Sequence, residues 1–172
     1  DIWLNEGFAT YSEALWAESQ NGWDGYISDL LLNQYFGSGT IYVPDTGDWG
    51  RIFNSNLSYN KASWVLHMLR GAFGDSLFFA GLAEFRQRFE YASATTADFQ
   101  QVYEDVTGED LNAFFQEWIY GEYYPVYSYD WTAAPAGGGW DVSLSVEQLQ
   151  SWQVFTMPVE VVVSTGQGNQ SF

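Results

Sequence analysis

The sequence predicts a mostly α-helical chain that changes to β-strands towards its C-terminal end. Apolar residues recur every three or four positions through most of residues 1–122, which is the spacing of a buried helix face. From Tyr123 onward, apolar and polar residues alternate instead, as they do along a strand. The chain has 172 residues, 47% of them hydrophobic, so it can bury a sizeable core in one or two domains.

The opening segment, Asp1–Ala17, predicts a helix with two different faces. One face is apolar and consists of Leu4, Phe8, Tyr11 and Leu15. Glu6, Thr10 and Glu13 repeat at the same interval on another face, so their polar groups point the same way. The simplest interpretation of that face is contact with solvent. However, the neighbours of Glu6 are apolar or small, which makes an unpaired charge there costly and favours a specific partner.

Further helices are expected along the chain. After a break at Asn21–Gly22, apolar positions predict a second helix over 26–36. Residues 37–57 form a long irregular connection, a type of segment that is often functional. Helices then follow over 64–74, 76–89, 96–107 and 111–120, with Thr95 and Asp98 as a start signal and glycines at the ends.

Two strands are predicted near the end of the chain, over 140–146 and 155–163. Residues 133–139, which are rich in glycine, are expected to be a turn or a short linker. Two or three strands are only marginally stable alone, so this part is expected to belong to a larger sheet structure.

Composition excludes several classes of protein. The formal charge of -17 argues against a nucleic-acid or anionic-membrane partner. No apolar run is long enough for a transmembrane helix, and the absence of cysteine excludes disulfides and thiolate metal sites. The sequence does not determine a location, although the acidic balance slightly favours an extracytoplasmic or secreted one, and it leaves the oligomeric state open.

Trp3–Ala9, with the sequence WLNEGFA, resembles the signature of the gluzincin zinc aminopeptidases, the aminopeptidase N family. The resemblance implies that Glu6 is the third ligand of one zinc ion. The other two ligands would be histidines of an HExxH helix upstream of Asp1, so the chain is interpreted as a fragment of the catalytic domain. Thr10 and, less directly, Glu13 would support the ligand. The only histidine present, His67, lies in an apolar helical context and is expected to be structural.

A second element, Ser58–Ser63, resembles the Y-E-K-G element of the same family. Tyr59 and Lys61 keep that pattern, whereas Asn60 and Ala62 depart from it. The resemblance implies that the Tyr59 hydroxyl donates a hydrogen bond to the oxyanion formed during peptide hydrolysis. Lys61 is expected to be an ion-pair or capping residue rather than a catalytic one.

The family resemblance also implies the domain organisation and the activity. Residues 1–122 would be the C-terminal half of a thermolysin-like metallopeptidase catalytic domain, and residues 123–172 the start of a β-sandwich-like domain. The whole enzyme would hydrolyse the N-terminal peptide bond of peptides with metal-activated water. The fragment alone is expected to be inactive, because one carboxylate does not hold a catalytic zinc ion.

Three alternatives stay open from the sequence alone. A non-catalytic relative that keeps the fold as an interaction scaffold would explain the same helices, but it has little reason to retain both Glu6 and Tyr59. A carbohydrate-binding module would explain the 9 tryptophans, although most of them fall at the spacing of a helix core. An endopeptidase or an epoxide-hydrolysing relative would share the same motifs.

Overall fold

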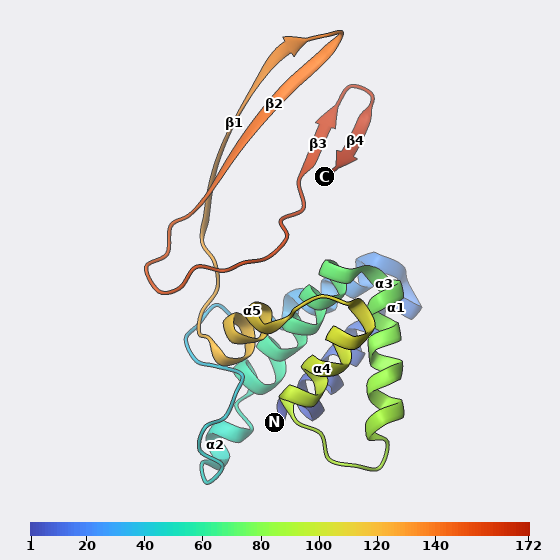
Figure 1. Ribbon diagram of the computed structural model, residues 1–172, viewed down its shortest axis with the longest axis vertical. Helices are drawn as coiled ribbons and strands as arrows, with labels where there is room; N and C mark the ends of the chain where they lie inside the picture. Colours follow the sequence, from blue (N-terminus) through green and yellow to red (C-terminus); the bar gives the residue numbers. More distant parts are fainter.

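The computed structural model describes residues 1–172, and it places two β-hairpins above a group of packed helices (Figure 1). The helices are α1 (Trp3–Leu32), α2 (Trp49–Ile52), η1 (Ser55–Lys61), α3 (Ala62–Phe89), α4 (Thr96–Thr107), α5 (Asn112–Phe115) and η2 (Gln116–Tyr120), of which η1 and η2 are π-helices. The strands are β1 (Tyr127–Ala136), β2 (Gly139–Gln148), β3 (Val162–Thr165) and β4 (Gly168–Ser171). The predicted order of helices followed by strands is confirmed.

The core lies between α1, α3, α4 and α5 and is dominated by aromatic side chains. Phe99 of α4 is at its centre, with its ring edge-on to the rings of Trp3, Phe8 and Phe85. Such edge-to-face pairs add to the stabilisation that burial of the rings already supplies. The apolar stripe predicted on the first helix packs against this core. None of the helices combines the length and apolar character that crossing a lipid bilayer requires.

Two long helices are interrupted by glycines, as the sequence signals suggested. Gly22 in α1 has φ 67° and ψ -160°, and Gly74 in α3 has φ 71° and ψ 167°, a positive-φ conformation that residues other than glycine rarely adopt. The break expected at Asn21–Gly22 is therefore confirmed.

The second helix was predicted to reach residue 36, and this is wrong. It ends at Leu32, and Phe36 instead contacts the ring of Tyr124 edge-on.

The start and end signals of α4 are confirmed in detail. Asp98 N–H donates to the Thr95 hydroxyl at 3.3 Å, and Thr95 N–H donates to the Asp98 carboxylate at 2.8 Å. This reciprocal pair is a capping box. Gly108 ends the helix in the left-handed conformation, with φ 76°.

Each sheet is a single antiparallel hairpin, β1 with β2 and β3 with β4. β1 continues to Ala136, so the turn occupies only Gly137 and Gly138, both with positive φ. The turn or linker expected over 133–139 is therefore shorter than predicted.

The strand predicted over 155–163 is mostly wrong, because β3 begins only at Val162. Phe155 is buried instead against Trp118 of η2, with ring centroids 4.7 Å apart. The Gln148 side chain bonds both the N–H and the carbonyl of Phe155, at 2.9 and 2.7 Å. Phe155 and Met157 thus pack onto the helices, whereas Val159, Val161 and Val163 face the first hairpin.

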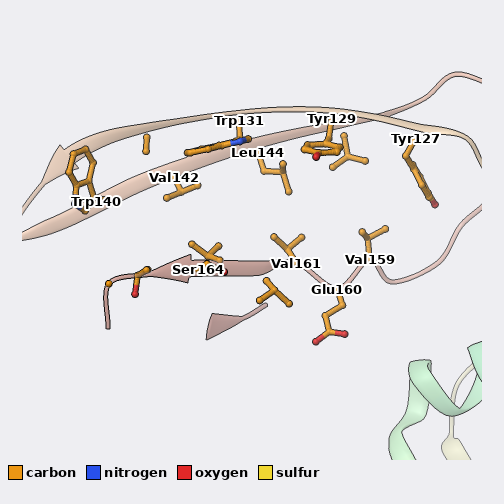
Figure 2. Close-up of a pocket in the computed structure, with 16 residues that line it drawn as sticks. Tyr127, Tyr129, Trp131, Trp140, Val142, Leu144, Val159, Glu160, Val161 and Ser164 are labelled. Carbon is orange, nitrogen blue, oxygen red and sulfur yellow. The ribbon is translucent and has the colours of Figure 1, made fainter. Parts of the chain in front are cut away.

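An apolar cleft lies between the two hairpins (Figure 2). Trp131, Val142 and Leu144 face Val161 across it, and Glu160, its only charged lining residue, points away. No residue before Tyr127 lines this cleft, and it offers no arrangement of groups for acid-base or metal chemistry.

The tryptophans are more exposed than the sequence pattern indicated. Only Trp3 and Trp118 are buried. The exposed ones are Trp16, Trp23, Trp49, Trp131, Trp140 and Trp152. The expectation that most tryptophans form the helix core is therefore wrong.

Candidate active site

The fold brings Glu6 of α1 next to Tyr59 of η1, although the two residues lie far apart in the sequence. Partial burial raises the pKa of the Tyr59 hydroxyl above its ordinary value. The negative charge of the neighbouring Glu6 carboxylate raises this pKa further. Tyr59 is therefore a neutral hydrogen-bond donor at neutral pH, beside a carboxylate.

The start of α1, which carries Glu6, is fixed by a buried hydrogen-bond chain. The Trp3 indole N–H donates to the Thr96 hydroxyl at 2.9 Å, and that hydroxyl donates to the Asp1 carboxylate at 2.6 Å. Trp3 is 1% exposed, so its indole is surrounded by other protein atoms. These bonds tie the first turn of α1 to the first turn of α4.

Gly7, the residue after Glu6, allows α1 to approach the start of α3 very closely. A Cβ atom on Gly7 would lie 2.5 Å from the Cβ of Ala62, closer than two such atoms can pack. Ala62 is fully buried and follows directly after η1. The Gly7 to Ala62 contact therefore sets the spacing between the helix that carries Glu6 and the helix that carries Tyr59.

We expect Gly7→Ala to destabilise the protein, although alanine is the better helix former. The gain in helix propensity is about 1 kcal/mol, whereas overpacking a rigid contact costs about 1 to 3 kcal/mol. The melting temperature, measured by calorimetry, should therefore fall. The double variant Gly7→Ala with Ala62→Gly moves one methyl group from one helix to the other, so it should restore the melting temperature of the unaltered protein. An unchanged melting temperature for Gly7→Ala alone would show that the contact is not tight.

Tyr59 is presented by η1, a π-helix whose N-terminal part is fixed by side-chain hydrogen bonds. The Asn54 side chain accepts from Leu57 N–H at 3.1 Å, and the Ser58 hydroxyl donates to the carbonyl of Ile52 at 2.8 Å. Single turns of π-helix occur frequently at functional sites. No sequence signal predicted this conformation, and the irregular connection was expected to continue to residue 57.

The other predicted site residues have different surroundings. The Thr10 hydroxyl is buried and donates to the backbone carbonyl of Glu6 at 3.0 Å, not to its carboxylate. Glu13 is exposed. The Nδ1 atom of His67 shares a hydrogen bond of 2.8 Å with the Tyr26 hydroxyl. Burial lowers the pKa of His67, and the positive charge of Arg70 lowers it further. Supporting roles for Thr10 and Glu13 remain predictions.

Glu6 fits one position of a zinc site, and the chain supplies no complete set of ligands. The ion pairs of the chain involve Arg70, Arg86 and Arg88, and none of them reaches Glu6. A half-buried carboxylate without a cationic partner is the kind of oxygen donor that zinc accepts beside histidines. No group of three or more potential ligand side chains is present in residues 1–172.

Sequence reasoning missed two residues that shape this site. Gly7 was treated only as a small neighbour of Glu6, and its contact with Ala62 depends on the packing of two helices. Lys61 was expected to be an ion-pair or capping residue, and its ammonium does bond the carbonyl of Gly121, the C-cap of η2. Its burial and its second bond, to the carbonyl of Gly39, were not predicted. The sequence did offer one signal for a special role of Lys61, because this residue is the only lysine in a strongly acidic chain.

Comparison with known proteins gives consistent matches. Residues 1–118 match the model of the peptidase family M1 domain. The chain is 30% identical over 138 residues to the alanine/arginine aminopeptidase of Saccharomyces cerevisiae, covering 74% of this chain and 16% of the relative. It is 33% identical over 135 residues to aminopeptidase M1-D of Oryza sativa subsp. japonica, covering 73% and 15%.

A solved structure with a similar fold is Legionella pneumophila aminopeptidase A in complex with aspartic acid. It aligns with a TM-score of 0.70 and 18% sequence identity, over 86% of this chain and 17% of that chain. The chain thus spans about one sixth of the length of the proteins it matches.

Proposed function

The chain belongs to peptidase family M1, and on that basis we propose that it is part of a zinc-dependent aminopeptidase that hydrolyses N-terminal peptide bonds. In this proposal Glu6 is one zinc ligand and Tyr59 the donor to the reacting carbonyl oxygen. Two histidines expected upstream of Asp1 complete the ligand set. Residues 1–122 belong to the catalytic domain and residues 123–172 to a following β-domain.

Zinc, when bound, supplies a Lewis acid for the scissile carbonyl and lowers the pKa of the attacking water. Two residues of this chain act beside it. Glu6 would hold one position of the metal. Tyr59 donates its proton in a hydrogen bond to the carbonyl oxygen as negative charge develops there. A donor that acts mainly on the transition state raises kcat more than it lowers KM.

The single observation that carries this proposal is the pairing of Glu6 with Tyr59. Each residue lies in a motif that resembles the family's, and the fold brings the two together through the contact of Gly7 with Ala62. A scaffold protein without catalysis has no need for this pair. The relatives in yeast and rice are named as aminopeptidases, which also favours catalysis over a scaffold role.

The proposed substrate is a peptide with a free N-terminus. The charge of -17 opposes nucleic acid as a partner. An extracytoplasmic or secreted location is slightly favoured in this proposal, although the charge alone does not select it.

Removal of zinc tests the proposed chemistry. Treatment of the complete enzyme with a chelator should abolish hydrolysis of aminoacyl substrates, and one equivalent of zinc should restore it. The isolated 172-residue chain should stay inactive with added zinc, because it offers Glu6 without histidine partners at the site. Activity that survives full removal of the metal would contradict the proposal.

A further inference from the structure

Lys61, the only lysine in the chain, is buried at the end of η1 with 6% of its surface exposed. Its ammonium group donates to the backbone carbonyls of Gly39 and Gly121, at 3.2 Å in both cases. Gly39 belongs to the loop after α1, and Gly121 follows η2. One side chain therefore connects three segments that are distant in the sequence.

The two segments that Lys61 bonds are also bound to each other. Gly39 N–H donates to the Glu122 carboxylate at 2.9 Å, and Tyr42 N–H donates to the carbonyl of Ile119 at 2.9 Å. Arg51 adds hydrogen bonds from its guanidinium to the carbonyls of Thr40 and Tyr42. Lys61 thus bonds two segments that other hydrogen bonds already join.

The charge of Lys61 suits this role at neutral pH. Burial lowers the pKa of Lys61 to about 8, with the charge of Glu122 opposing this shift and that of Arg51 adding to it. The ammonium therefore stays mostly protonated at pH 7 and keeps its donors. A buried cation with hydrogen bonds to carbonyls is costly to replace by an apolar group, because those carbonyls lose their partners.

Tyr59 lies two residues before Lys61 on the same helix, so the two side chains are roughly half a turn apart. Tyr59 faces Glu6 on α1, and Lys61 faces the loop and η2 on the other side. The helix is consequently held from both sides, by Lys61 on one and by the Gly7 contact with Ala62 on the other.

We propose that Lys61 is a positioning residue that fixes η1 so that the Tyr59 hydroxyl stays directed at the reacting carbonyl oxygen. The inference rests on the proposed function, in which Tyr59 stabilises the transition state. Lys61 itself does not touch the substrate, since its ammonium is occupied by Gly39 and Gly121.

The test is a double-mutant cycle in the complete enzyme. Lys61→Met should lower kcat about 10- to 100-fold, because a displacement of the Tyr59 hydroxyl by about 1 Å is enough to cause a loss of that size. KM should change little, since substrate binding does not depend on Tyr59. In a Tyr59→Phe background, Lys61→Met should cause no further loss of kcat, because the group it positions is already gone.

A matched control separates positioning from loss of stability. Tyr103→Phe removes another buried hydrogen bond, from the Tyr103 hydroxyl to the carbonyl of Phe78 at 2.8 Å. It should lower the melting temperature and leave kcat unchanged. If Lys61→Met does not accumulate as folded protein, Lys61→Gln, which keeps a shorter donor, takes its place in the same cycle.

Two results would overturn the inference. One is a loss of kcat by the same factor with and without Tyr59, which indicates an effect independent of the tyrosine. The other is an unchanged kcat for the lysine variant while Tyr59→Phe alone shows its full loss. A Tyr59→Phe enzyme with normal kcat would instead contradict the proposed function, and this inference with it.

Discussion

Tyr59→Phe in the complete enzyme should lower kcat about 10²- to 10³-fold, the usual cost of removing one hydrogen-bond donor to a developing oxyanion. The variant keeps the aromatic ring and its packing and loses only the hydroxyl. KM should change little, because the lost hydrogen bond is stronger in the transition state than in the ground state. Steady-state kinetics with an aminoacyl-arylamide substrate measures both constants.

Zinc content and a matched variant give the controls for this experiment. The variant should bind one zinc ion per chain, as the unaltered enzyme does, since Tyr59 is not a zinc ligand in the proposed mechanism. Tyr103→Phe removes a hydroxyl that bonds the carbonyl of Phe78 in the core, and its kcat should be unchanged. A Tyr59→Phe enzyme with normal kcat would exclude the proposed role.

Glu6→Gln should have the second large effect, on metal binding. Removal of groups that only support zinc ligands weakens binding about 10- to 100-fold, so loss of a charged ligand should weaken it by at least about 100-fold. The zinc content of the purified enzyme, measured by mass spectrometry, should fall well below one ion per chain, and activity should fall with it.

Asp24→Asn is the matched control for Glu6→Gln. Asp24 lies on α1 just after the interruption at Gly22, is exposed, and forms no ion pair. The amide should leave zinc content and kcat unchanged. Equal zinc content in the Glu6 and Asp24 variants would contradict the assignment of Glu6 as a ligand.

Local sequence signals predicted the helical part well because each depends on neighbouring residues. Gly22, Gly108 and the pair of Thr95 with Asp98 act through backbone conformation or through hydrogen bonds three residues apart. The end of the chain was less predictable. Alternation near Phe155 suggested a strand, but a ring contact with Trp118 and hydrogen bonds from Gln148 hold that segment in an irregular conformation.

The candidate site was predictable only in part. Glu6 and Tyr59 were found because both lie in motifs with a family resemblance, and nothing in their spacing required them to meet. Their proximity depends on Gly7 packing against Ala62, a contact between helices that no short sequence pattern encodes. The burial of Lys61 likewise depends on carbonyls from two other segments.

Diffraction data collected at the zinc absorption edge from crystals of the complete enzyme would locate the metal relative to Glu6. We expect one anomalous peak about 2.0 to 2.2 Å from a carboxylate oxygen of Glu6, the usual distance for zinc and carboxylate. The Tyr59 hydroxyl should face the open side of that ion. A zinc peak elsewhere in the enzyme, with Glu6 unbound, would refute both the ligand assignment and the mechanism built on it.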